Sequence, residues 1–247
     1  MAGHSHSANI ARRKGFVDAK RAKIFSKVSR FILSSARQGG ADPDMNLRLK
    51  YAIEAARAVN MPKDNIERVL KRAVGDKSGG GFEELVYEGY APGGVALIIT
   101  CLTDNRARTI SDLKHIMDKR GGNMGAPGSV GYLFDKRSIF NVETPGLNED
   151  QLTELALDVG ADDVQGSDGA ATFVAGPTEF LAVKAALEKK GLKFISAEVG
   201  YMPQNTVAVA TKPAAAAVLA LIEALEDNDD VQNVYANYDI APELMPE

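Results

Sequence analysis

Hydrophobic residues recur at steps of three and four over the first third of the chain, a spacing that places them on one face of a helix. This pattern predicts a first helix over residues 16–37, which Gly39-Gly40 ends. A second helix is predicted from Asp42-Pro43, an N-cap followed by proline at the first helical position, and a third closes at Gly75. Three short helices around one small core predict a helical bundle domain. The expected inward residues are Ile24, Phe25, Val28, Phe31, Ile32, Leu49, Ala52, Ile53, Ala56, Ile66, Val69, Leu70 and Ala73.

Strands and helices alternate beyond residues 78–81, a serine and glycine run that is typical of a linker. Helices are expected to begin at the caps Asn105 and Asn148, the second with Gln151 placed for a capping box. Two further helices are expected over residues 177–190 and 213–225. The expected strands cover residues 95–101, 129–134, 138–143, 193–199, 206–210 and 231–238, with a hairpin turning at residues 167–169.

The order of these elements predicts two sheet domains, one inside the other. The middle segment has the strand–helix–strand–strand–helix–strand order of a ferredoxin-like unit. The strand–helix–strand units on either side of it then form the halves of a second sheet, because each half alone would leave open edges and a poor core. The sequence therefore predicts an α+β protein, with an N-terminal three-helix domain followed by two ferredoxin-like α/β domains, one nested in the other. The predicted domains are residues 1–78, residues 79–135 with 203–247, and the inserted residues 136–202.

Composition limits the cellular setting of the protein. The chain has 247 residues, of which 45% are hydrophobic. Its longest apolar runs are far shorter than the roughly 18–20 residues that a membrane-spanning helix needs, and no secretory signal is visible near the start. The single cysteine, Cys101, excludes an intrachain disulfide and fits a reducing compartment. We therefore expect a cytoplasmic protein without a membrane partner.

The net charge of −4 combines two parts of opposite sign. Residues 1–78 hold 17 lysines and arginines against 7 acids, whereas residues 79–247 hold 12 against 26. This division favours a basic module that binds a polyanion, carried on an acidic body. The alternative left open is that the two halves attract one another.

A basic stripe near the N-terminus is the strongest candidate site. Four of its cations, at steps of 3, 4 and 3, share one helix face that we expect to be exposed. Such charge density suits phosphate contacts, and the scarcity of aromatic residues favours contact with backbone and shape over base sequence. A solvated helix face is the alternative. The expected nucleic-acid-binding residues are Arg12, Arg13, Lys14, Lys20, Arg21, Lys23, Lys27 and Arg30.

A glycine-rich loop at residues 121–129 is a second candidate contact. Four glycines in nine residues allow a backbone to approach a ligand closely. A long turn after a helix end explains the composition equally well. The residues of this candidate contact loop are Gly122, Asn123, Gly125, Gly128 and Ser129.

The sequence contains no motif that indicates an enzyme. Phosphate-binding, dinucleotide-binding, metalloprotease and serine-hydrolase signatures are all missing. Cys101 lies in an apolar strand and is expected to be a structural thiol, His115 a solvated histidine, and residues 227–230 a solvated turn. We expect no catalytic residue, no metal, no cofactor and no small-molecule substrate.

Several blocks of sequence resemble the YebC/PmpR family, which includes mitochondrial translational activators. They are MAGHS at 1–5, DAKRAKIF at 18–25, NMPKDNIER at 60–68, YEGYAPGG at 87–94, LTDNR at 102–106 and GSV at 128–130. The resemblance covers essentially the whole chain and implies a helical domain followed by two α/β domains. The chain departs from the family where His6-Ser7 replaces the usual Lys-Trp, which removes a cation and an aromatic ring that stacks on bases.

The resemblance implies a non-enzymatic regulator of gene expression that binds nucleic acid, of the DNA-binding transcriptional regulator type. The alternative is a ribosome-associated translation factor or translational activator that binds ribosomal or messenger RNA. A protein-interaction adaptor that docks on an acidic partner is a third interpretation, and the salt dependence of binding separates it from the first two.

Overall fold

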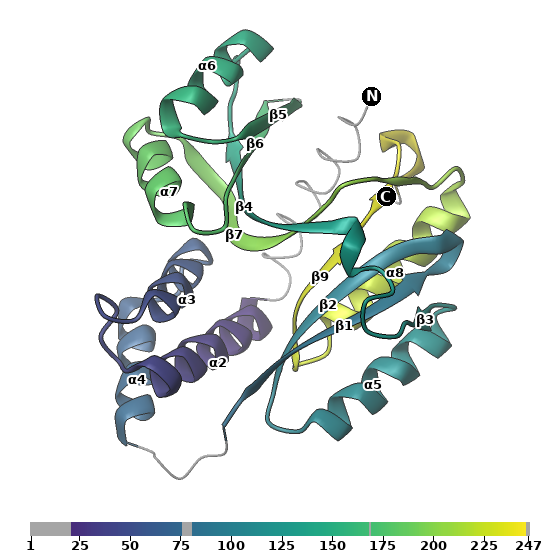
Figure 1. Cartoon of the computed structure of the whole chain (residues 1–247), viewed down its shortest axis with the longest axis horizontal. Coiled ribbons are helices and arrows are strands. Elements are labelled where there is room, and N and C mark those ends of the chain that lie inside the picture. Colours follow the sequence, from purple (N-terminus) through teal and green to yellow (C-terminus); the bar gives the residue numbers. More distant parts are fainter. Residues whose placement is uncertain (1–20, 76–80, 168, 246–247) are drawn as a thin grey trace.

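The computed structural model describes residues 21–75, 81–167 and 169–245, and Figure 1 shows how their helices and sheets are arranged. Three helices form one body, and most of the rest consists of two four-stranded antiparallel sheets with their own helices. The expected α+β class, with helices first and two ferredoxin-like sheets after them, is confirmed. The helices of the first body are α2 (Arg21–Gly39), α3 (Leu47–Ala58) and α4 (Lys63–Gly75).

The helical body is built as the hydrophobic spacing predicts, except at the start of α3. Buried Ile32, Leu49 and Ile66 hold the three helices together. The cap of α3 is Asn46 and not Asp42: its side-chain oxygen accepts from the Leu49 amide at 3.1 Å, and its side-chain amide donates to the carbonyls of Ser35 in α2 and of Gly40 just after that helix. Asp42 instead accepts from the amide two residues on, which makes it part of a turn before the helix.

The first sheet has the strand order β3-β1-β2-β9, with α5 and α8 over one face. Its elements are β1 (Glu83–Ala91), β2 (Val95–Thr103), α5 (Arg106–Lys119), β3 (Asn123–Met124), α8 (Lys212–Glu226) and β9 (Val231–Ala236). The sheet has the strand order of a ferredoxin-like unit if β2, β3, β1 and β9 are taken as its first, second, third and fourth strands. Strand β1 was not predicted from the sequence, and it forms a hairpin with β2 through a turn at η1 (Pro92–Gly94).

Two strands predicted for this sheet are not part of it. Residues 131–133 form a 3-10 turn, η2 (Gly131–Leu133), so the strand expected at 129–134 is wrong. The strand expected at 206–210 shortens to β8 (Val207–Ala208), which pairs in parallel with β10 (Tyr238–Asp239) in a separate small sheet. A further 3-10 turn, η3 (Pro242–Leu244), follows.

The second sheet is contributed by the middle of the chain and has the order β5-β6-β4-β7. Its elements are β4 (Phe134–Glu143), α6 (Glu149–Val159), β5 (Asp163–Ser167), β6 (Ala170–Ala175), α7 (Phe180–Lys189) and β7 (Lys193–Pro203). The capping box predicted at Asn148 and Gln151 is present. Strands β4 and β7 pair as far as Phe134, which lies opposite Pro203. The domain boundaries predicted between residues 135 and 136 and between residues 202 and 203 therefore both fall inside this strand pair.

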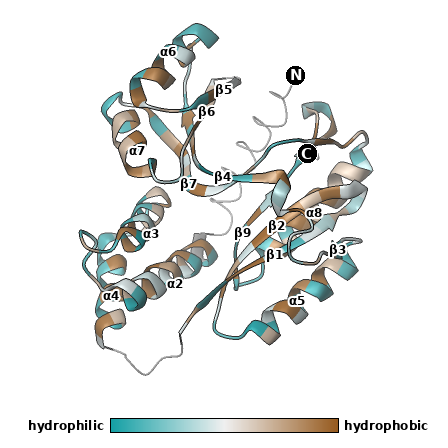
Figure 2. Cartoon of the chain, in the orientation of Figure 1, coloured by the Kyte–Doolittle hydropathy of each residue, from teal (hydrophilic) through white to brown (hydrophobic). Residues whose placement is uncertain are grey.

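The two sheets have separate hydrophobic cores. Figure 2 shows hydrophobic residues concentrated along β2 and α8, which pack against each other. Within the described ranges, no helix combines the length and hydropathy needed to cross a membrane.

Candidate nucleic-acid interface

The basic stripe lies only partly within the described residues. Arg12, Arg13, Lys14 and Lys20 lie outside them, as does the side chain of Arg21. The three remaining members, Lys23, Lys27 and Arg30, lie on α2 and face the turn at residues 226–230 between α8 and β9. We call the contact between these three cations and that turn the latch.

The latch engages three of the eight cations that the sequence assigned to phosphate. Lys27 Nζ donates to the main-chain oxygen of Glu226 at 2.6 Å, and Lys23 Nζ lies 3.6 Å from a carboxylate oxygen of Asp227. Arg30 Nη1 donates to the main-chain oxygen of Asp229 at 2.9 Å. The prediction that these side chains are exposed is wrong, because an acidic turn far away in sequence covers them. These three residues contact the acidic part of the chain, as the alternative of attraction between the two halves expects.

Asp230 lies at the centre of the latch, and its side chain is only 5% exposed. Its carboxylate accepts from Arg108 at 2.8 Å and from Arg30 at 3.1 Å. The hydroxyls of Thr103 and Thr109 donate to it at 3.1 Å and 2.9 Å. Burial opposes ionisation, but these hydrogen bonds outweigh it and hold the pKa of Asp230 below its usual value. The expectation of a solvated turn is therefore wrong at Asp230.

Lys27 is the most perturbed cation of the latch. Burial lowers the pKa of its ammonium from 10.5 to about 8, although the carboxylate of Glu226 acts in the opposite direction. A lysine held in this way contributes to domain packing and is poorly placed to contact a phosphate.

The candidate contact loop is held firmly by one carboxylate. Glu88 on β1 accepts from the amides of Gly128, Val130 and Gly131 at 2.7, 2.6 and 2.8 Å. Burial would raise the pKa of Glu88, but these three backbone hydrogen bonds lower it below its usual value.

Part of the loop is strand, because Asn123 pairs with Tyr90 to form β3. The Tyr90 hydroxyl donates to the Ser129 carbonyl at 3.0 Å. A Cβ at Gly125 would lie 2.3 Å from Ser129 Oγ, so a close approach explains this glycine. The loop is thus a fixed support that exposes Asn123 and residues 126–128, not a flexible connection.

The outer face of α4 carries cations that sequence analysis did not single out. Arg68, Lys71 and Arg72 are exposed on the side of the helix opposite buried Ile66 and Ala73. None of the three cations forms an ion pair with any residue in the ranges that the structure describes. Their spacing of three and four could have identified this face, but the denser N-terminal stripe dominated the charge pattern.

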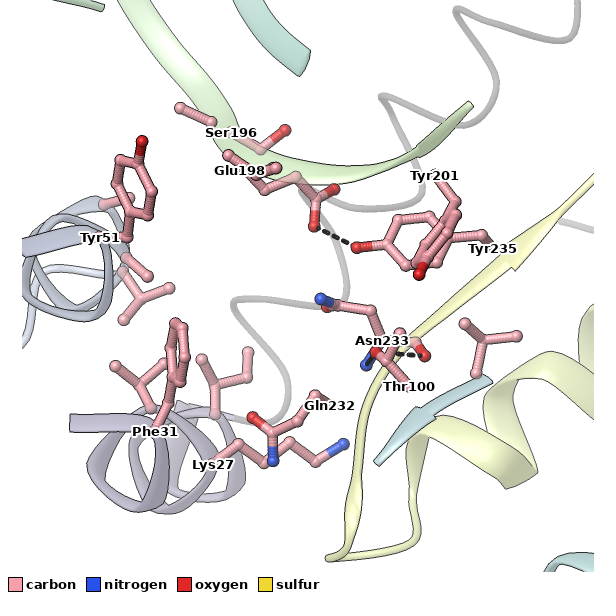
Figure 3. A pocket seen from close by; sticks show the side chains of 18 of the residues that line it. Lys27, Phe31, Tyr51, Thr100, Ser196, Glu198, Tyr201, Gln232, Asn233 and Tyr235 are labelled. Atoms are coloured by element: carbon pink, nitrogen blue, oxygen red, sulfur yellow. Dashed lines mark hydrogen bonds between the residues drawn. The ribbon is translucent and has the colours of Figure 1, made fainter. Parts of the chain in front are cut away.

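A central cavity of about 1140 Å³ lies between α2, α3, β7 and the first sheet (Figure 3). Phe31 and Tyr51 lie on its helical side, Tyr201 on β7, and Asn233 and Tyr235 on β9. These residues come from three distant parts of the chain, so no local motif could have predicted the cavity.

The residues considered for chemistry fit a structural assignment. Cys101 is buried in β2, and burial raises the pKa of its thiol to about 12, which makes it a poor nucleophile. His115 is exposed on α5 as expected. Among the described residues, no group of three or more histidine, cysteine, aspartate and glutamate side chains is arranged to hold a metal ion.

Two models of known protein families together match nearly the whole chain. Residues 5–76 match the TACO1/YebC protein N-terminal domain, and residues 82–238 match the TACO1/YebC second and third domain. The chain belongs to the TACO1/YebC family. This confirms the resemblance found in the sequence.

Members of the TACO1/YebC family resemble this chain over its full length. Probable transcriptional regulatory proteins of Halothermothrix orenii and Syntrophus aciditrophicus are 47% and 45% identical to it, over 100% and 99% of this chain and 98% of each relative. The crystal structure of a conserved hypothetical protein from Aquifex aeolicus is 44% identical, with a TM-score of 0.83 over 94% of this chain and 95% of that one.

Proposed function

We propose that this protein is a non-enzymatic regulator of gene expression that binds nucleic acid through its helical body. The observation that carries the proposal is the outer face of α4. There Arg68, Lys71 and Arg72 point away from the helical core and have no acidic partner among the described residues. Residues 1–78, of which α4 is part, carry an excess of ten positive charges in the sequence. Clustered, unpaired cations of this kind bind phosphate backbones.

The relatives support the regulatory part of the proposal. Those from Halothermothrix orenii and Syntrophus aciditrophicus carry the name probable transcriptional regulatory protein. Their identity to this chain extends over all its parts, so the same role is proposed here. A regulator of this kind acts in the cytoplasm, where it meets its nucleic acid.

The polymer that is bound can be DNA or RNA, because phosphate contacts are shared by both. We propose DNA first, following the names of the relatives. A translation factor that binds structured RNA or the ribosome is the second candidate, and the fixed contact loop favours it. A rigid loop that exposes Asn123 and residues 126–128 suits a defined, folded surface better than a uniform duplex.

The test is equilibrium binding of the full chain to a DNA duplex, a structured RNA and purified ribosomes over a range of salt concentrations. Each phosphate contact contributes about −0.9 to the slope of log K against log salt for duplex DNA. A triple variant, Arg68→Gln, Lys71→Gln and Arg72→Gln, should therefore flatten the slope by roughly 2 to 3.

The matched control removes three exposed cations from the acidic body, with Lys114→Gln, Lys119→Gln and Arg120→Gln on and just after α5. Its total charge equals that of the α4 variant, so a purely non-specific effect would change both alike. Equal slopes for the two variants would contradict the assignment to α4. Absence of binding to all three polymers would refute the proposed function and favour the adaptor.

A further inference from the structure

The first sheet exposes part of the face that no helix covers. Helices α5 and α8 pack on one face of it. On the opposite face, one end is closed where Phe134 and Val130 pack over Ile98 and Tyr235. The rest of that face forms a wall of the central cavity, where Val86 on β1 is 53% exposed.

One row of this open face runs across three strands. Val86 lies opposite Thr100, and Thr100 lies opposite Asn233. The Thr100 hydroxyl bonds to the main chain of Asn233 at 3.2 and 3.3 Å, which fixes the backbone there. Figure 3 shows the Asn233 carboxamide pointing into the cavity. A side-chain amide can donate to and accept from the edge of a planar ring.

A second amide next to it is unsatisfied. Nε2 of Gln232 is buried and has no hydrogen-bond partner among the residues that the structure describes. A buried donor without an acceptor costs free energy, and such a group in a native structure calls for an explanation. Gln232 lies on the lining of the cavity beside Lys27, so a ligand with acceptor atoms would satisfy it.

The other walls offer aromatic rings and a free cation. Tyr51 of α3 and Tyr201 of β7 lie on opposite sides of the cavity (Figure 3). Lys136 on β4 is the direct cross-strand neighbour of Tyr201, so the two side chains share a face of the sheet. Lys136 is exposed and makes no ion pair with any described residue. A ring beside an unpaired cation is a pair of groups that suits a base and its phosphate.

From this combination we infer that the central cavity binds a short single-stranded segment of nucleic acid, with bases against Tyr51 and Tyr201, base edges on Asn233 and Gln232, and a phosphate at Lys136. This rests on the proposed function and adds a second, base-contacting site to it. The volume of about 1140 Å³ is slightly larger than that of pockets for drug-sized ligands, roughly 300–1,000 Å³, which suits a few nucleotides. A duplex is excluded because its bases are stacked inside and cannot meet the rings.

The lining also predicts a weak dependence on salt. The cavity lining has four carboxylates, Glu84, Glu143, Glu198 and Glu226. Glu84 and Glu143 are paired with Arg48 and Lys193, Glu198 accepts from the Tyr235 hydroxyl at 3.1 Å, and Glu226 lies close enough to Lys27 to raise the pKa of its ammonium. Most charges of the described lining are therefore already compensated. Affinity there comes from stacking and amide contacts. The salt slope of cavity binding should therefore be that of one or two phosphates, well below the slope for the α4 face.

The experiment measures binding of the full chain to a labelled 12-nucleotide oligouridine, its single-stranded DNA counterpart and a 20-base-pair duplex. Val86→Glu adds a negative charge at an exposed position of the cavity wall. Asn233→Asp keeps the shape of the side chain but replaces its donor by a charge. Leu157→Glu is the control, because Leu157 is 76% exposed on α6 and is not part of the cavity lining.

We expect Val86→Glu and Asn233→Asp each to weaken single-strand binding about 10-fold or more, since unfavourable charge contacts are costly. Tyr51→Leu should weaken it at least about 5-fold through lost stacking. Binding to the duplex should stay within about twofold in all variants, and Leu157→Glu should match the wild type. Thermal unfolding of each variant shows whether it is folded.

Two results would overturn the inference. One is equal single-strand affinity for Val86→Glu, Asn233→Asp and the control. The other is loss of that affinity only when Arg12, Arg13 and Lys14 are replaced by glutamine, which would assign the single strand to the N-terminal segment. If either result is found but the wild-type chain still binds the duplex, the proposed function stands and only the cavity site is refuted. If the wild-type chain binds no nucleic acid, both the proposed function and the cavity site are refuted.

Discussion

Replacing the central carboxylate of the latch should destabilise the protein while leaving its shape intact. Asp230→Asn preserves the volume of the side chain and one acceptor oxygen for the two threonine hydroxyls. It removes the charge that faces Arg108 at 2.8 Å and Arg30 at 3.1 Å. The helical body and the first sheet would then be joined by weaker contacts at this point.

The expected loss of unfolding free energy is about 2 to 3 kcal/mol. Breaking a fully buried ion pair costs about 3–5 kcal/mol, and a hydrogen bond to a charged group contributes about 1.5–3 kcal/mol. The lower part of these ranges applies, because the side chains of Arg108 and Arg30 are 47% and 28% exposed and regain contact with water. With a urea m-value of about 2 kcal/mol/M, the midpoint should fall by roughly 1 to 1.5 M.

Urea unfolding at pH 7 is the assay, with Asp229→Asn as the matched control. Asp229 is the exposed neighbour whose main-chain oxygen, not its side chain, contacts Arg30, so its replacement should change stability by less than about 0.5 kcal/mol. Because the folded pKa of Asp230 is depressed, its contribution is present above the usual value of 3.8 and disappears as pH falls through the folded pKa. Equal midpoints for Asp229→Asn and Asp230→Asn at pH 7 would refute the reasoning.

Three further perturbations test neighbouring parts of the account. The pKa of Lys27 is about 8 in the folded protein and 10.5 in the unfolded chain, so the unfolding free energy of the wild type should rise relative to that of Lys27→Met as pH rises between those values. Urea unfolding that gives the same pH dependence of this free energy for both proteins would contradict the expectation. Glu88→Gln should cost about 1–3 kcal/mol and speed hydrogen exchange of the Gly128, Val130 and Gly131 amides, with Glu83→Gln unchanged as control. Cys101 should react with a thiol reagent only on unfolding, and rapid modification of the native chain would show that its burial is wrong.

Local signals predicted much of the fold. Hydrophobic spacing identified the helices, and side-chain caps fixed the starts of α5 and α6 at Asn105 and Asn148. Strand β1 was missed because its residues are mostly exposed or half-buried and it includes Gly89, so its pattern resembles a loop. Its place is decided by pairing with β2 and β3, which is information that the segment itself does not carry.

The candidate site was predicted less well, because the residues that meet there are far apart in the sequence. Lys27 and Glu226 are 199 residues apart, and nothing near either residue shows that they meet. The charge asymmetry favoured a polyanion partner and left attraction between the halves as the alternative, and it did not show which cations such an attraction would engage. The row formed by Val86, Thr100 and Asn233 likewise depends on the register of three strands, which is set by the whole sheet.

The central claim is that the protein contacts nucleic acid in the cell. The most direct measurement is ultraviolet crosslinking in living cells, followed by purification of the full chain, identification of the crosslinked DNA or RNA, and mapping of the crosslinked peptides. The account predicts crosslinked nucleic acid on peptides that contain α4 or the lining of the central cavity. Recovery of the chain without nucleic acid, while it is bound to an acidic protein, would contradict the account.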